Sequence, residues 1–180
     1  WRPPPVTSRR SGGCGQCSSP SITAVAAIAE RLQAPGKTVF VLDGDEIRAI
    51  IPGNYGYTKK DRKSLAIFYA KLARSLACQG VDVVCATISL FHEVQSWNRE
   101  NIKNYVEIFL DAPIEDLKIR RNKGVYSPNY RLENVMGVDI AAELPRTPDI
   151  HVKWTPDLTK KILTEIVWEK ILLHDIRKRN

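Results

Sequence analysis

The sequence predicts an α/β fold of three layers, in which a parallel sheet is flanked by helices. Two observations predict it. Short apolar segments of strand length alternate with longer helical segments along most of the 180 residues. One short segment, residues 81–88, is an almost continuous apolar run, which is typical of a parallel strand buried on both faces.

Each element follows from composition and spacing. The first helix is alanine-rich and ends before Pro35-Gly36. The longest helix ends at Gly80, and its apolar face is formed by Leu65, Phe68, Tyr69, Leu72 and Leu76. The last helix is apolar at Leu158, Ile162, Ile166 and Leu173. In order, we expect helix 24–32, strand 39–42, helix 59–79, strand 81–88, helix 91–103, strand 105–110, helix 114–121, strand 150–152 and helix 158–176.

The N-terminus differs from the rest of the chain. Residues 1–20 are rich in Pro, Ser, Arg and Gly, and Val6 is their only aliphatic side chain larger than alanine, so they cannot form a core. We expect an irregular or misread segment, or a fragment, because Trp1 rather than Met opens the chain. A single domain over residues 21–180 follows, with a lid at about 122–148, where Gly, Pro and Asn recur.

Composition limits the function classes. The net charge of +7 suits a polyanionic ligand such as a nucleotide, and equally a basic solvated surface. No window is long and apolar enough to span a membrane, and no secretion signal is visible. Cys78 and Cys85 lie in apolar stretches, which predicts buried thiols of a reduced, cytoplasmic protein. Cys14 and Cys17 lack further zinc ligands nearby. We expect neither nucleic acid nor a membrane as partner.

Asp43-Gly44-Asp45 directly follows a predicted strand, where open parallel sheets bind ligands. A carboxylate there can accept a proton from an attacking hydroxyl or hold water on Mg²⁺. Arg48 would face the same cleft from a following helix, and its guanidinium matches phosphate or sulfate oxygens. The alternative is a turn with a capping aspartate and a solvated arginine. Ser89, after the next strand, either contacts a substrate or caps a helix.

Several blocks occur in the order and spacing of one enzyme family. They are Leu-Asp-Gly-Asp-Glu-Ile-Arg at 42–48, Gly-Tyr-Thr-Lys-Lys-Asp-Arg at 56–62, Ile-Ser at 88–89, Phe-Leu-Asp-Ala-Pro-Ile-Glu at 109–115, Lys-Gly-Val-Tyr at 123–126, Gly-Val-Asp at 137–139 and Pro-Arg-Thr-Pro-Asp at 145–149. From about residue 24 to 152, the chain resembles the adenylyl-sulfate kinase family.

This resemblance implies a P-loop NTPase kinase fold, often dimeric, that serves sulfate assimilation. Its enzymes move the γ-phosphoryl group of ATP to the 3′-hydroxyl of adenylyl sulfate with Mg²⁺. The resemblance implies that Asp43 is the base or the metal-side carboxylate and that Lys123 is a lid lysine near the phosphates. The implied substrate contacts are Asp45, Arg48, Tyr57 (by ring stacking), Arg62, Ile88 and Ser89, and the implied ATP contacts are Thr23 and Arg120.

The phosphate-binding loop departs from the family pattern. The motif G-x-x-x-x-G-K-S/T falls on residues 15–22, where Pro20, Ser21 and Ile22 replace its second glycine, its lysine and its Mg²⁺-binding hydroxyl. Because one lost electrostatic contact typically costs about 3–4 kcal/mol of barrier, we expect weak ATP binding and very slow catalysis. A pseudokinase or a frame error upstream of Ser21 would explain the departure, and loss of the preceding strand favours the frame error.

Three functions remain open. The first is an adenylyl-sulfate kinase. The second is a sister kinase that acts on a cytidine diphosphate derivative in surface-polysaccharide synthesis. Residues 89–91 and 138–145 are similar to that sister group, and Leu65 and Leu90-Phe91-His92 replace residues typical of adenylyl-sulfate kinases. The third is a non-catalytic nucleotide-binding domain.

Overall fold

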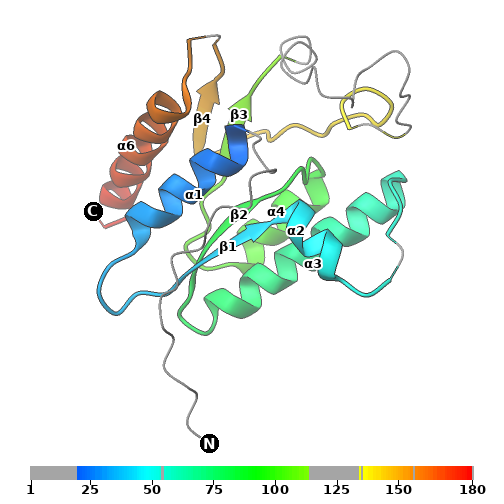
Figure 1. Ribbon diagram of the computed structural model, residues 1–180, viewed down its shortest axis with the longest axis horizontal. Helices are drawn as coiled ribbons and strands as arrows, with labels where there is room; N and C mark the ends of the chain where they lie inside the picture. The colour runs from blue at the N-terminus through cyan, green and yellow to red at the C-terminus, as the bar shows by residue number, and fades with distance from the viewer. Residues whose placement is uncertain (1–19, 54, 114–133, 135, 156, 180) are drawn as a thin grey trace, which may run out of the picture.

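The computed structural model describes residues 20–53, 55–113, 134, 136–155 and 157–179. Its elements are α1 (Pro20–Leu32), β1 (Val39–Asp43), α2 (Gly44–Ile50), α3 (Lys59–Ala77), β2 (Asp82–Ala86), α4 (His92–Asn101), β3 (Ile108–Asp111), β4 (Ile150–Lys153) and α6 (Lys160–Arg179) (Figure 1). The predicted alternation of strands and helices is confirmed, while the expected helix at 114–121 lies outside the described residues. In the described part of the chain, no helix has the length and apolar character needed to cross a membrane.

The strands pair in parallel, as predicted. β1 pairs with β2, with Asp43 opposite Ala86, and β3 pairs with β4, with Ile108 opposite Ile150. Within the described residues these are two separate two-stranded sheets rather than one continuous sheet. The two sheets share a core, because Val84 of β2 packs against the same apolar cluster as Ile150.

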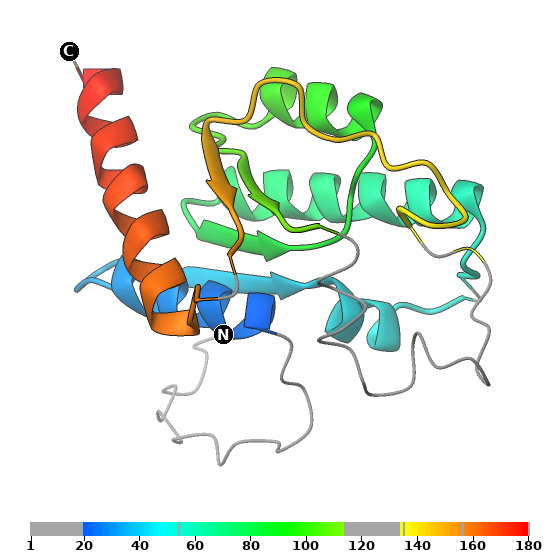
Figure 2. The same ribbon diagram turned by 90° about the horizontal axis from the view of Figure 1, so that it is seen from above.

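Helices cover both faces of the strands and form the predicted three layers (Figures 1 and 2). Leu42 of β1 packs against Leu65 and Tyr69 of α3. Val84 of β2 packs on the other side, in a cluster with Ile28 of α1 and the α6 residues Leu163 and Val167. Because successive side chains of a strand point to opposite faces, Val83 and Val84 of β2 contribute to different layers. α1 and α6 therefore lie side by side opposite α3 and α4.

The prediction of buried thiols is wrong, because Cys78 and Cys85 are both exposed. Cys78 is the C-cap residue of α3 and lies at the exposed end of that helix. Cys85 lies on β2, which is only partly buried and, among the described residues, has a hydrogen-bonded strand on one edge only. An apolar sequence run therefore does not guarantee that a strand is fully covered.

The apolar stripe expected on the last helix is also partly wrong. Ile162 and Leu173 are 45% and 50% exposed, whereas the neighbouring Leu163 and Val167 are buried. The expected apolar residues and the buried ones both recur at helical spacing. Leu163 and Val167 are the buried ones because that face of α6 contacts α1 and β4. On α3, Leu65 and Tyr69 are buried as expected, whereas the expectation is wrong for Phe68, which is 38% exposed.

Candidate functional site

The first component of the site is the carboxyl end of β1, which leads directly into the short helix α2 (Figure 2). Asp43 is 7% exposed, and its Oδ1 accepts hydrogen bonds from the amides of Asp45 (2.8 Å) and Glu46 (3.4 Å). Asp43 is thus the N-cap of α2, a position where a carboxylate also complements the helix dipole. The capping role of Asp43 is confirmed, whereas Arg48 is held by carbonyl groups and is not simply solvated. The cap fixes a carboxylate at the carboxyl end of the strand, where open parallel sheets bind ligands.

Gly44 brings this turn against the end of β2. A Cβ atom at position 44 would lie 3.1 Å from Cγ2 of Thr87, so a larger residue would have to displace its neighbour. The Thr87 hydroxyl lies 2.9 Å from the Ser89 hydroxyl, which places both hydroxyls at this edge. Ser89 does not cap α4, whose N-cap residue is Phe91. Ile88, between the two hydroxyl residues, is 57% exposed.

Two arginines lie close to one exposed aromatic ring beside the turn. The guanidinium carbon of Arg48 lies 4.8 Å from the centre of the Tyr57 ring, and that of Arg62 lies 5.2 Å from it. Arg48 comes from α2 and Arg62 from the first turns of α3. The structure therefore brings together Asp43, Asp45, Arg48, Tyr57, Arg62 and Ser89, which the sequence had singled out.

The arginines are held by backbone carbonyl groups. Arg48 Nη1 donates to the carbonyls of Tyr55 (2.9 Å) and Gly56 (3.2 Å). Arg62 Nε donates to the carbonyls of Tyr57 and Asn134, each at 3.1 Å. Among the described residues, neither guanidinium forms an ion pair with a carboxylate. Burial and the charge of Arg48 lower the pKa of Arg62, as expected for neighbouring cations.

A second carboxylate organises the loop after Ser89. Glu143 Oε2 accepts the amide of His92 (2.7 Å), and the Glu143 amide donates to the carbonyl of Leu90 (3.1 Å). Lys59, at the start of α3, lies 3.7 Å from Glu143 Oε1. This bond from the His92 amide and the charge of Lys59 lower the pKa of Glu143. The sequence had marked Glu143 only as part of the stretch 138–145 and not as a residue that organises this loop, because its partners lie far away along the chain.

Three predicted site residues cannot be assigned contacts. Lys123 and Arg120 lie outside the described residues, as do residues 1–19, which hold most of the segment aligned with the phosphate-binding loop. Thr23 lies in the first turns of α1, but its side chain is not described. Of the predicted lid, residue 134 and residues 136–148 are described, and Asn134 and Glu143 are the members that contact the site.

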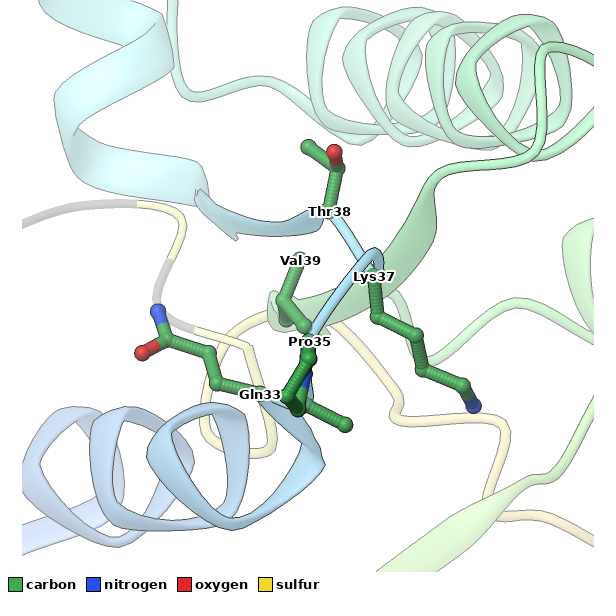
Figure 3. A pocket seen from close by; sticks show the side chains of 6 residues that line it. Gln33, Pro35, Lys37, Thr38 and Val39 are labelled. Atoms are coloured by element: carbon green, nitrogen blue, oxygen red, sulfur yellow. The ribbon is translucent and has the colours of Figure 1, made fainter.

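A surface hollow at the turn between α1 and β1 is unrelated to these residues (Figure 3). It is lined by Gln33, Ala34, Pro35, Lys37, Thr38 and Val39. The side chains of Gln33 and Lys37 point away from each other, so they do not converge on a ligand. The hollow lies at the amino end of β1, whereas Asp43 ends the same strand at its carboxyl edge.

Comparison with known proteins shows the family to which the chain belongs. Residues 14–153 match the family model described as adenylylsulphate kinase. The chain belongs to the adenylylsulphate kinase family. It is 38% identical over 133 residues to the cytidine diphosphoramidate kinase of Campylobacter jejuni, a match that covers 73% of this chain and 78% of that protein.

An adenylyl-sulfate kinase of Pseudomonas aeruginosa is 34% identical over 132 residues, with 69% of this chain and 67% of that protein covered. The Mycobacterium tuberculosis APS kinase CysC, solved in complex with AMPPNP and APS, superposes with a TM-score of 0.72 at 24% identity, over 84% of this chain and 90% of that chain. At this identity the similarity shows the fold alone, and it agrees with the predicted α/β fold.

The residues of the site fit Mg²⁺ better than they fit the phosphates of ATP. Asp43 fits one carboxylate contact to Mg²⁺, an ion that commonly keeps several waters and binds through one or two carboxylates and substrate phosphates. No group of three or more metal-binding side chains occurs within the described ranges. The start of α1 does not fit the ATP phosphates, because Pro20 has no N–H and the first lysine of the chain is Lys37.

Proposed function

We propose that this chain binds an anionic nucleotide at the carboxyl edge of β1 and β2 and phosphorylates it from ATP. The acceptor that the family implies is the 3′-hydroxyl of adenylyl sulfate. The observation that carries the proposal is the pair Arg48 and Arg62 around Tyr57, since these guanidinium groups are fixed by carbonyls and not neutralised by a described carboxylate. Such a pair favours phosphate or sulfate oxygens.

Each side chain has a role in this proposal. The Asp43 carboxylate would act as the base for the acceptor hydroxyl or as the contact to Mg²⁺, and Tyr57 would stack on the nucleotide base. The remaining contacts to the acceptor nucleotide are Asp45, Arg48, Arg62, Ile88 and Ser89. ATP would have to supply the phosphoryl group without the P-loop lysine, with Thr23, Arg120 and Lys123 as its proposed contacts.

A cytidine nucleotide is the second candidate acceptor. The 38% identity to a cytidine diphosphoramidate kinase exceeds the 34% identity to the Pseudomonas aeruginosa adenylyl-sulfate kinase. Leu90 and His92 also replace the residues that adenylyl-sulfate kinases carry next to Ser89. Both residues are bonded to the segment around Glu143: the Leu90 carbonyl accepts the Glu143 amide, and the His92 amide donates to the Glu143 carboxylate.

Non-catalytic binding is the third candidate. The residues that begin α1 lack the lysine and the hydroxyl through which P-loops contact ATP and Mg²⁺. A protein that keeps the binding site for the nucleotide to be phosphorylated but has lost the ATP-binding site would bind that nucleotide without transferring phosphate to it. We therefore expect turnover to be slow even where the acceptor binds.

The test measures binding and turnover separately. Adenylyl sulfate and cytidine diphosphoramidate are titrated calorimetrically, and each is then incubated with ATP and Mg²⁺ while its phosphorylation is followed. Phosphorylation of the cytidine compound alone would exclude the adenylyl-sulfate assignment. Binding without turnover would support a non-catalytic domain, and the failure of both nucleotides to bind would refute the proposal.

The variant Arg62→Gln should weaken binding of the preferred nucleotide by about 10- to 100-fold, because it removes a charge-assisted contact. The matched control is Arg74→Gln. Arg74 lies on the same helix and also donates its Nε to a carbonyl, that of Asn101 at 3.1 Å, but it lies at the other end of α3. Equal effects of the two variants would show that the charge at position 62 contributes nothing specific.

A further inference from the structure

The turn that carries Asp43 and Asp45 is supported from the α3 side by Tyr69. The Tyr69 hydroxyl donates a hydrogen bond of 2.6 Å to the carbonyl oxygen of Gly44. The tyrosine ring is 6% exposed and packs in the cluster that contains Leu42 and Leu65. A buried ring with fixed packing can hold its hydroxyl in one place.

The orientation of the Gly44 carbonyl affects both carboxylates of the turn. It belongs to the peptide group that joins Gly44 to Asp45, and Asp43 precedes the same glycine. On the β2 side, Thr87 leaves Gly44 little room, since a Cβ atom on Gly44 would come within 3.1 Å of the threonine methyl group. Gly44 is therefore held between Tyr69 and Thr87, and rotation of this peptide would move the Asp45 amide that the Asp43 carboxylate binds.

We propose that Tyr69 is a positioning residue, which acts through the Gly44 carbonyl to hold the Asp43 and Asp45 carboxylates in the orientation that the nucleotide site needs. The inference rests on the proposed function, because it assigns these carboxylates to substrate or metal. Tyr69 touches neither the reacting atoms nor the nucleotide. Its effect on turnover is transmitted entirely by the backbone of the turn.

The hydroxyl is suited to this role. Burial raises the pKa of Tyr69 to about 12, with opposing effects of Arg48 and Asp45, so the hydroxyl stays protonated at any working pH and remains a donor. Phenylalanine would preserve the ring packing and remove only the donor. The Tyr69→Phe variant therefore separates the hydrogen bond from the apolar contact.

The control variant is Tyr105→Phe. Burial raises the pKa of Tyr105 to about 12 as well. Its hydroxyl accepts a hydrogen bond of 3.5 Å from Nδ2 of Asn98, which lies on α4 and not at the turn. Both variants lose a buried hydroxyl, so both should lower the thermal midpoint by similar amounts. A purely structural role for Tyr69 would leave kcat alike in the two variants.

The experiment compares kcat and KM for the preferred nucleotide in the full chain. We expect Tyr69→Phe to lower kcat by about 10- to 100-fold relative to Tyr105→Phe, because small misplacements of a reacting group are costly. A kcat within about twofold of the control would overturn the inference.

If the unmodified chain phosphorylates neither nucleotide, the proposed function fails, and amide hydrogen exchange decides the inference alone. Asp45 and Glu46 should then exchange faster in Tyr69→Phe than in Tyr105→Phe, since their amides bind Asp43. Equal exchange at both amides would overturn the positioning role.

Discussion

At the residue scale, the candidate site depends on short backbone contacts that orient charged side chains. Asp43 is fixed by the amides that it caps, and Arg48 and Arg62 are fixed by carbonyl groups. Carbonyl partners orient a guanidinium without neutralising it, so the charge remains available to an anion. The same residues would bind anions poorly if each arginine were paired with a carboxylate.

Leu42, which precedes Asp43, should be the most sensitive apolar residue of β1. It is 0% exposed and packs against α3, so Leu42→Ala should lower the free energy of unfolding by about 3 kcal/mol in urea denaturation. Val41→Ala is the control, since Val41 is 37% exposed and should cost less than about 1 kcal/mol. Similar losses for both would contradict the burial of Leu42.

At the element scale, α4 lacks a local cap. Its N-cap residue, Phe91, makes no side-chain hydrogen bond to the helix, and Glu143 supplies that contact from a distant segment. The first turn of α4, the loop after Ser89 and the start of α3 are thereby tied to the segment that contains Glu143. A helix that is capped at long range also orders the loop leading into it.

The Glu143 contact predicts a pH dependence of stability. Because its pKa is lowered from 4.5 in the folded state, ionised Glu143 stabilises the fold above 4.5 and loses this contribution as the pH falls through the folded value. Glu143→Gln should therefore lower the thermal midpoint at neutral pH, and the difference from the unmodified chain should shrink in acid. Glu100→Gln, at an exposed position of α4, is the control and should show no such convergence.

At the scale of the whole molecule, one ionic network joins elements that are remote in sequence. Arg99 of α4 contacts Glu107 at 2.8 Å and Asp149 at 3.2 Å, and His174 of α6 lies 3.4 Å from Asp149. The amide of Glu107 also donates to Asp149 at 2.8 Å. Although burial opposes ionisation, this amide bond and the charge of Arg99 lower the pKa of Asp149.

Removing Arg99 should destabilise the whole domain. Arg99→Met leaves Glu107, which is 8% exposed, without its cation, and we expect a loss of about 2 kcal/mol in chemical denaturation. This value lies below that of fully buried pairs because the Arg99 side chain is 35% exposed. Lys63→Met breaks an exposed pair with Glu93 and should cost about 0.5 kcal/mol or less. Equal costs would argue against a role of the network in joining the layers.

The sequence predicted most of the elements and the main residues of the candidate site. Period and composition indicated the helices and strands, and the placement of Asp43, Arg48, Arg62 and Ser89 around one sheet edge agrees with the expectation. It did not predict Tyr69 or Glu143 as site-supporting residues. Both act through contacts to backbone atoms of distant segments, and no local pattern marks such a partner.

By itself, the sequence determined the α/β class, because the spacing of apolar residues distinguishes helices from strands. It also determined the family and the carboxylates, arginines and hydroxyls that follow β1 and β2, because these occur in motifs at fixed spacing. Only the tertiary structure decided which face of α6 is buried, that Cys85 is exposed, and that two arginines share one tyrosine ring without a described carboxylate partner. Burial and charge balance depend on which neighbours arrive from elsewhere in the chain. The exposure of a side chain and the partners of a charged group are therefore decided only when the layers pack together.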